Sequence, residues 1–474
     1  MAQVKRSGSV SVRMYRGILG DCFLLRYEEQ GEATRHVLID CGVLQGVANA
    51  RDKMTEVVSD LLSTTGGRLD LLVVTHEHHD HLSGFQYEQE RFVKDFSVDE
   101  FWLAWTEDPT DPTAIGLRAQ FDKSKNALAA LAAQPKMTAL KDQDARIRNV
   151  LELSAFLGLD TQGRPTGAKN LQMLKDKATP ARTRYLEPGD VVTPTRIDSL
   201  KVYVMGPPRD TAALRRDAPR TGAAKEVYLS RQEEANALEL QLAQLDGTQI
   251  PPQELPFAKP HQRSLDALAK TRPEDYSLTQ KLYYDAKATG RKIDEEWYSS
   301  AETLALKMDS DTNNTSLVLA IELPDGQILL FPGDAQVGNW LSWADQTYPR
   351  TPDPAEGAAL SVDDILARVS LYKVGHHCSH NATLRQMGLE KMISPRLVAM
   401  IPVVTQVARD NHWNMPYPDL YQALKDKTQQ RLVIGDSVMA DERQAFEKNP
   451  TSSQLPAVLA YRDDGLWVEI KISF

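Results

Sequence analysis

Seven of the ten histidines in this chain of 474 residues lie in two short segments. Residues 75–81 read Thr-His-Glu-His-His-Asp-His, and residues 375–380 read Gly-His-His-Cys-Ser-His. Histidine is the commonest metal ligand among side chains, and core packing gives no reason to gather it at two places. The chain is therefore expected to fold so that segments from its two halves meet at a metal site.

The first histidine segment follows an apolar run at residues 71–74, which predicts a buried strand with a ligand-rich loop at its carboxyl end. His76 and His78 are two residues apart on extended backbone, so their side chains point the same way and can bind one ion. Asp80 and His81 are adjacent, and on a turning loop they can bind a second ion. The alternative interpretation is a polar loop whose histidines are incidental.

The order His-x-His-x-Asp-His resembles the signature of the metallo-β-lactamase superfamily, and other motifs are most similar to the soluble hydrolase domain of the ComEC/Rec2 competence proteins. The segments that carry the resemblance are 20–25, 38–42, 76–81, 186–190, 205–208, 313–319, 330–335 and 373–379. The resemblance implies an α/β fold: an αββα sandwich of two mixed sheets flanked by helices, with helical insertions. It covers residues 1–105, 184–208 and 311–474.

The domain organisation follows from the places where strand-like and helical patterns alternate. Helical spacing of apolar residues in the interval 112–180 predicts an insertion rather than core strands. The predicted parts are a first half of the core at 1–105, a helical insertion at 106–183, core strands at 184–208, a second insertion forming a cap or lid at 209–310, and the second half of the core at 311–474.

The resemblance also implies ligands from the second half of the chain. Asp334 follows an apolar strand-like run and is expected to bridge two ions, although Gly-Asp is also a common turn pair. His376 or His377 would complete the second site. Adjacent residues at a strand end point to opposite faces, so one of the two is expected to be the ligand, with a slight preference for His376. Asp80 and His377 are the expected catalytic residues, and the histidine that is not a ligand would contact substrate or protonate a leaving group.

Three residues are candidates for supporting roles. Asp40 ends a strand-like segment, and the resemblance implies that it hydrogen-bonds the metal loop; such carboxylates fix imidazole tautomers. Ser316 and Asn314 could serve the same loop or the substrate, and they are equally well interpreted as ordinary strand-entry residues.

The chain departs from the family pattern at three points. Cys378 stands where glycine is usual, next to the histidine pair. Met415 takes the place of a histidine that often precedes proline near the C-terminus, and His412 is a possible substitute. Finally, no histidine lies between His81 and His261, so the third ligand of the first site in lactamases has no obvious counterpart.

Composition limits the setting. No run of eighteen apolar residues is present, the first residues lack the apolar core of a secretory signal, and three widely spaced cysteines do not form a disulfide framework. We therefore expect a cytoplasmic protein without a transmembrane segment. The net charge of −10 argues against tight non-specific binding of duplex nucleic acid, although a metal centre supplies positive potential of its own.

Together these observations predict a metal-dependent hydrolase that uses a metal-activated hydroxide. Two divalent ions are expected, Zn²⁺ from the nitrogen and carboxylate ligands, with Mn²⁺ or iron as alternatives. The predicted activity is phosphodiesterase or nuclease-like, on a nucleic acid strand or a small nucleotide or ester. The alternatives are a hydrolase of carboxylic esters, thioesters or lactams, and a metal-stabilised binding or scaffold module. The sequence indicates no protein partner.

Overall fold

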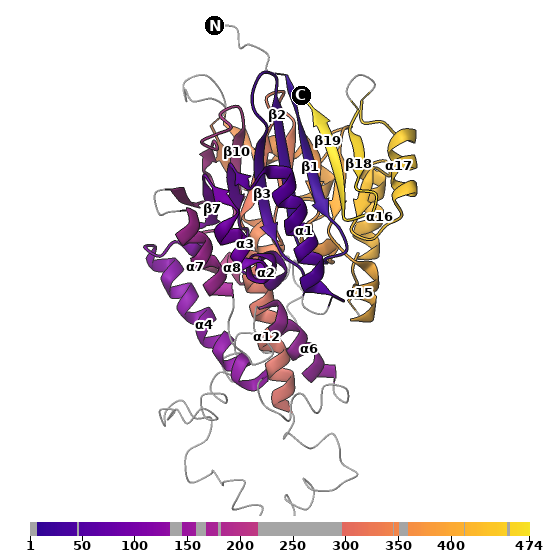
Figure 1. Ribbon diagram of the computed structural model, residues 1–474. Helices are drawn as coiled ribbons and strands as arrows, with labels where there is room; N and C mark the ends of the chain where they lie inside the picture. The colour runs from indigo at the N-terminus through magenta and orange to yellow at the C-terminus, as the bar shows by residue number, and fades with distance from the viewer. Residues whose placement is uncertain are drawn as a thin grey trace, which may run out of the picture.

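Two mixed β sheets pack face to face, with helices on their outer faces (Figure 1). The expected αββα sandwich of the metallo-β-lactamase fold is thereby confirmed. The computed structural model describes residues 7–44, 47–132, 145–157, 167–178, 182–216, 296–344, 346–349, 359–411, 413–452 and 456–474. Most of the second predicted insertion, residues 217–295, lies outside these ranges.

The first sheet joins strands from both ends of the chain. Its order is β18-β19-β1-β2-β3-β5-β7-β8. Pairing is antiparallel from β18 to β3 and parallel from β3 to β8. The strands are β1 (Gly8–Tyr15), β2 (Cys22–Glu29), β3 (Arg35–Cys41), β5 (Leu71–Val73), β7 (Phe101–Ala104), β8 (Thr183–Leu186), β18 (Val458–Tyr461) and β19 (Trp467–Ser473).

The second sheet has the order β17-β16-β15-β12-β11-β10-β9, parallel from β17 to β12 and antiparallel beyond. Its strands are β9 (Val191–Val192), β10 (Lys201–Gly206), β11 (Val318–Glu322), β12 (Ile328–Phe331), β15 (Val369–Lys373), β16 (Val398–Ile401) and β17 (Leu432–Ile434). Two short pairs lie apart from the main sheets: β4 (Arg68–Leu69) with β6 (Ser97–Val98), and β13 (Thr347–Tyr348) with β14 (Leu360–Ser361).

The alternation of side chains along each strand builds two apolar layers. Phe23 of β2 points between the sheets and meets Phe331 of β12 edge to face, with ring centroids 5.8 Å apart. Its neighbour Leu24 points outward, into the layer that also contains Met54 and Leu61 of helix α1 (Ala50–Thr65). Both faces of the sheets are therefore buried, which explains why their central strands are almost wholly apolar.

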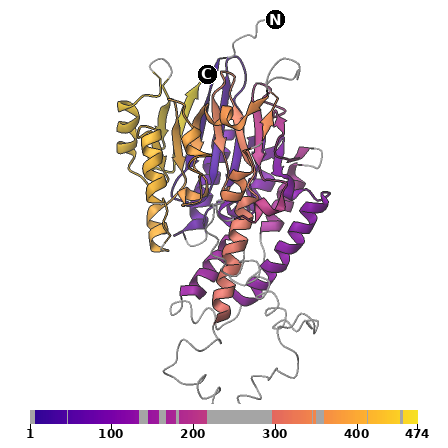
Figure 2. The same cartoon turned by 180° about the vertical axis from the view of Figure 1, so that it is seen from behind.

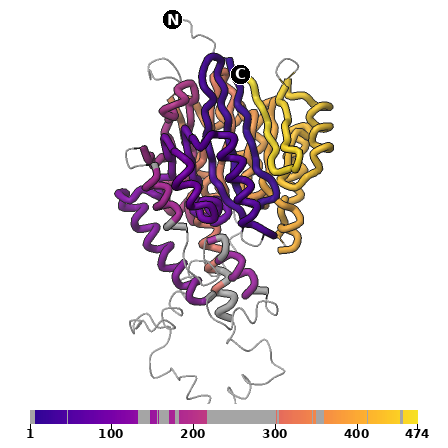
Figure 3. Tube along the Cα trace, viewed as in Figure 1, coloured from indigo at the N-terminus to yellow at the C-terminus, as the bar shows by residue number. Residues whose placement is uncertain are grey.

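Further helices cover the sandwich and its edges. In Figure 1, α1 lies over the first sheet together with α2 (His79–Tyr87) and α3 (Gln89–Lys94). Seen from behind in Figure 2 and as a trace in Figure 3, the C-terminal helices gather at one side of the molecule. Helices of the second half are α13 (Val337–Leu341), α14 (Val362–Leu366), α15 (Thr405–Asp410), α16 (Pro418–Lys427) and α17 (Met439–Lys448).

Three helices project from the end of the sandwich opposite the two termini (Figures 1 and 2). They are α4 (Pro112–Ala132), α6 (Ala145–Phe156) and α12 (Glu296–Asn314), and they share a small apolar core that includes Leu128 and Leu304. The shorter α7 (Gly167–Ala178) and α8 (Thr211–Leu214) lie nearer the sheets. None of the described helices is both long and apolar enough to cross a lipid bilayer.

Candidate metal centre

The carboxyl ends of parallel strands from both sheets supply the candidate site. β3 and β5 are parallel neighbours in the first sheet, and β12 and β15 are parallel neighbours in the second. The metal loop, residues 75–81, follows β5 and runs into the first turn of α2. β12 and β15 are parallel, so Asp334 and His377, which follow them, lie at the same edge of the second sheet. This edge meets the metal loop of the first sheet.

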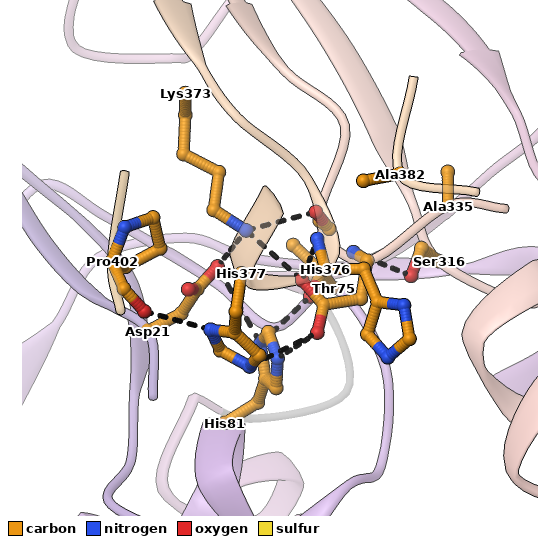
Figure 4. Close-up of polar contacts among 12 residues, drawn as sticks. Asp21, Thr75, His81, Ser316, Ala335, Lys373, His376, His377, Ala382 and Pro402 are labelled. Carbon is orange, nitrogen blue, oxygen red and sulfur yellow. Dashed lines mark hydrogen bonds and ion pairs between the residues drawn. The ribbon is translucent and has the colours of Figure 1, made fainter. Parts of the chain in front are cut away.

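Four side chains form a compact group of possible metal ligands. One atom from each of Asp80, His81, Asp334 and His377 lies within 4.8 Å of the others, and all four residues are buried. His377 Nε2 is 2.9 Å from Asp80 Oδ2, and His81 Nε2 is 3.2 Å from Asp334 Oδ2. Figure 4 shows His81 and His377 converging on this point. Two imidazoles and two carboxylates are a donor set suited to a divalent cation.

The tautomers of both imidazoles favour a cation at this point. His377 Nδ1 donates to the carbonyl oxygen of Pro402 (2.7 Å), and His81 Nδ1 donates to Asp40 Oδ2 (2.8 Å). Once a ring is neutral, its Nε2 therefore presents a lone pair to the carboxylate oxygens. Lone pairs that face each other repel unless a proton or a metal cation lies between them. Hydrogen bonds from Nδ1 of this kind are the usual support of metal-bound histidine.

The charges around the group of four ligands also favour a bound cation. Burial alone would lower the pKa of His81, but four surrounding carboxylates raise it well above its ordinary value: Asp334, Asp80, Asp21 and Asp40. Burial likewise opposes protonation of His377, whose pKa is nevertheless raised by Asp334 and Asp80. The site carries excess negative charge and is buried, so it attracts cations, and a metal ion can take the place of the protons.

His76 is also prepared to act as a ligand. The hydroxyl of Thr75 donates to Asp40 Oδ2 (2.7 Å), so the Thr75 oxygen is left to accept from His76 Nδ1 at 3.0 Å. The Nε2 atom of His76 is buried and has no hydrogen-bond partner. Burial and the neighbouring imidazoles lower its pKa well below the ordinary value, so the ring is neutral and its Nε2 lone pair is available.

His78 lies next to His76, with ring centroids 4.8 Å apart. Burial lowers the pKa of His78 to about 3. The compact ligand groups in the described part of the chain are the four-residue group above and a second one made of Asp21, Asp40 and His81; neither contains His76 or His78. The two histidines expected to bind the first ion thus lie together but outside these groups.

A buried lysine fixes the orientation of Asp334. Lys373 Nζ lies between Asp21, with which it forms an ion pair, and Asp334 Oδ1, at 3.0 Å (Figure 4). Asp334 Oδ1 also accepts the backbone N–H of His376 (2.9 Å). Burial would raise the pKa of Asp334, but Lys373 and His81 lower it well below the ordinary value. With Oδ1 satisfied, only Oδ2 faces the group, so any bridge between two ions uses that single oxygen.

The comparison with protein families concerns the region of the metal loop. Residues 16–128 match the family model of the metallo-beta-lactamase superfamily. This part of the chain is similar to a domain of that superfamily, and the match includes Asp21, Asp40 and the whole metal loop. No curated protein matches the chain. The match is to the superfamily as a whole, and the closer likeness to the ComEC/Rec2 domain stays a prediction from the sequence motifs.

Cys378, where the resemblance to the family implies glycine, lies in a turn of left-handed backbone together with the histidine pair. His376, His377 and Cys378 all have positive φ angles (39°, 49° and 64°), a region that residues with a Cβ rarely adopt. This turn directs the His377 ring into the group. The His376 ring lies beside it, with Nδ1 2.7 Å from Ser379 Oγ. The geometry thus favours His377 as the ligand, opposite to the slight preference from the sequence.

The remaining candidates occupy different places. Ser316 Oγ accepts the backbone N–H of Asp334 (3.0 Å) and lies 3.3 Å from His76 Nδ1, so it supports the site. Asn314 is turned elsewhere: its side chain bonds the Leu214 carbonyl and the Asn339 N–H. Burial raises the pKa of Cys378 to about 12, and this neutral thiol belongs to neither ligand group. His412 lies outside the described residues.

Asp21 and Lys373 are site residues that sequence reasoning missed. Asp21 lies in the segment 20–25 and Lys373 begins the segment 373–379, but neither was among the predicted site residues. One signal was available: Lys373 continues an apolar run from Val369 and is followed by Val374. A lysine inside a buried strand needs a carboxylate partner, although the sequence does not say which one.

Close packing of backbone against Gly42 holds the metal loop in place. A Cβ at Gly42 would lie 2.1 Å from the Asp80 carbonyl oxygen and 2.4 Å from the His81 nitrogen. We expect Gly42→Ala to destabilise the protein by at least about 1–3 kcal/mol, as overpacking does, and to reduce metal binding by displacing Asp80 and His81. Chemical denaturation and metal titration would measure both effects. Gly116→Ala is the control, since its Cβ would meet nothing within 4 Å; equal behaviour of the two variants would contradict the prediction.

Proposed function

We propose that this protein is a metal-dependent hydrolase that cleaves phosphodiesters. The observation that carries the proposal is the buried group in which two imidazole Nε2 atoms and two carboxylate oxygens converge, so that protons or a metal cation must lie between them. Asp80, His81, Asp334 and His377 would hold one ion. His76 and His78, with Asp334 Oδ2 as the bridge, would hold the other. Zn²⁺ suits these nitrogen and oxygen donors, and Mn²⁺ and iron are alternatives.

When bound, divalent cations in such a centre supply Lewis acidity, which ionises water near neutral pH and neutralises charge on the substrate oxygens. The protein's own groups have separate tasks. Asp80 Oδ1 is buried and has no hydrogen-bond partner, so it is an acceptor for the proton of the attacking water. The Nδ1–H of His81 donates to Asp40, and the Nδ1–H of His377 donates to the Pro402 carbonyl oxygen. Both rings are thereby kept in one orientation throughout the reaction.

A pocket lined by α4, α8 and α12 is the candidate place for the substituent of the substrate. Its lining is mostly apolar and includes Leu117, Phe121, Leu214 and Leu304, together with Arg215, Lys307 and Asp311. A smaller pocket shares Leu117 and Phe121 and extends to Glu77 of the metal loop. Lys307 pairs with Asp311, so the Arg215 guanidinium is the group in this lining that suits a phosphate ester with an organic substituent. The ComEC/Rec2-like motifs favour the same substrate class.

The proposal is tested by comparing chromogenic substrates. We expect the metal-loaded protein to hydrolyse bis-p-nitrophenyl phosphate faster than a chromogenic thioester or carboxylic ester, and a chelator to abolish the activity. Restoring the divalent ion should restore it. Preferred turnover of the thioester or carboxylic ester would instead favour the acyl-hydrolase alternative. Turnover of none of them by protein that holds its metal tightly would favour the binding or scaffold module.

A further inference from the structure

Helix α12 brings polar side chains to the metal loop. Asp309 and Asn313 are four residues apart and share one face of this helix. Asp309 Oδ1 lies 3.9 Å from His78 Nε2. Asn313 Nδ2 donates to Asp309 Oδ2 (3.3 Å) and lies 3.4 Å from His376 Nε2. The end of α12 thus joins His78 to the histidine pair of the second half.

The spacing of Asp309 and His78 fits two ligands of one ion. The distance of 3.9 Å between Asp309 Oδ1 and His78 Nε2 is too long for a hydrogen bond. Zinc–nitrogen and zinc–oxygen bonds are about 2.0–2.2 Å long, so two ligands of one ion lie between about 3 and 4.2 Å apart. Asn313 holds Asp309 through Oδ2, and the oxygen that approaches His78 is the other one, Oδ1.

Two buried atoms nearby give independent evidence that a cation belongs here. His76 Nε2 and Asn313 Oδ1 are both buried and have no hydrogen-bond partner. Leaving a buried acceptor unsatisfied costs about 1–3 kcal/mol. Each of the two side chains adjoins the Asp309–His78 pair, His76 through the His78 ring and Asn313 through Asp309, so a cation bound there would lie near both acceptors. The chain also has no histidine between residues 81 and 261 that could supply a third imidazole.

We propose that Asp309 is a protein ligand of the ion held by His76 and His78. The carboxylate takes the place of a third imidazole and comes from the last part of the predicted insertion at 209–310. This helix therefore belongs to the metal centre itself and does more than cover it. The inference rests on the two-ion centre of the proposed function, but not on its substrate.

Metal stoichiometry tests the assignment without any assay of activity. Metal-free protein would be titrated with Co²⁺ by calorimetry and by visible absorption, which reports the coordination of each site. We expect two equivalents in the wild type. Asp309→Ala should retain the ion of the four-residue group. It should lose the other ion or bind it at least about 100-fold more weakly, a larger loss of metal affinity than the 10–100-fold caused by removing a residue that only supports a ligand. Asp309→Asn keeps an oxygen but not the charge, so its affinity for this ion should lie between those of the wild type and Asp309→Ala.

Asp311→Ala is the matched control, because Asp311 is on the same helix and pairs with Lys307 at 3.1 Å instead of facing the histidines. It should take up two equivalents with wild-type affinity. Two unchanged equivalents in Asp309→Ala would refute the inference, and so would a wild type that binds a single ion. The wild type could bind two equivalents of metal and Asp309→Ala one, while neither hydrolyses phosphodiesters. This result would support Asp309 as a ligand and contradict only the proposed substrate. Melting curves of the metal-free variants check that each is folded.

Discussion

Replacing Asp334 by alanine is expected to reduce kcat/KM for phosphodiester hydrolysis by at least about 1,000-fold, which corresponds to about 4 kcal/mol of transition-state stabilisation. Asp334 Oδ2 faces both imidazoles of the ligand group, at 3.2 Å from His81 and 3.5 Å from His377. It is also the single oxygen available to bridge two ions, since Oδ1 is bound by Lys373 and by the His376 N–H. Removing it takes a ligand from each proposed ion at once.

The measurement pairs kinetics with metal analysis. Asp334→Ala should lose most of its bound metal, whereas Asp80→Ala, which removes a ligand of one ion only, should lose activity but keep part of the metal. Asp363→Ala is a control on the exposed first turn of α14, where Asp363 pairs with Lys391. The dinuclear mechanism would have to be abandoned if both Asp334→Ala and Asp80→Ala hydrolysed the substrate at the wild-type rate.

The parts of the fold that the sequence predicted are those governed by local pattern. Alternation of apolar and polar residues is sufficient to predict strands within 8–42, and Pro324-Asp325-Gly326 is sufficient to predict the turn between β11 and β12. The apolar run at 71–74 predicted the strand that ends in the metal loop. Each of these depends on side chains that are neighbours in the sequence, for which period and turn chemistry are sufficient.

The placement of strands in the two sheets could not be predicted in the same way. β18 and β19, from the end of the chain, pair beside β1 in the first sheet, whereas β9 and β10 lie in the second. These pairings depend on contacts between residues hundreds of positions apart, for example Val12 with Ile470. An apolar strand buried on both faces carries no mark of its partner.

The site was predictable as a set of residue types but not in its details. The metal loop and Asp334 are recognisable from spacing and motif. The choice between His376 and His377 depends on three successive left-handed residues, which no local pattern announces. Asp309 is outside any motif, since it becomes part of the site only because α12 ends beside His78.

The largest expected effect on stability belongs to Lys373→Met. Lys373 is fully buried between Asp21 and Asp334, and its ammonium also donates to the Gly333 carbonyl (2.8 Å). Replacing it by an apolar side chain of similar length leaves two buried carboxylates without their cation. Breaking a buried ion pair by removing one partner costs about 3–5 kcal/mol. We expect the free energy of unfolding of the metal-free protein to fall by that amount, measured by chemical denaturation.

A second variant separates loss of charge balance from loss of packing. In Lys373→Met with Asp21→Asn, one of the two unpaired charges is removed as well, so the double variant should be more stable than Lys373→Met alone. Divalent ions should also stabilise Lys373→Met, because a cation bound at Asp334 Oδ2 offsets part of the missing charge. A Lys373→Met protein within about 1 kcal/mol of the wild type would show that the ammonium does not neutralise these carboxylates. Asp334 would then be held in place by the His376 N–H and by the ions, and Lys373 would have no part in orienting the proposed bridge.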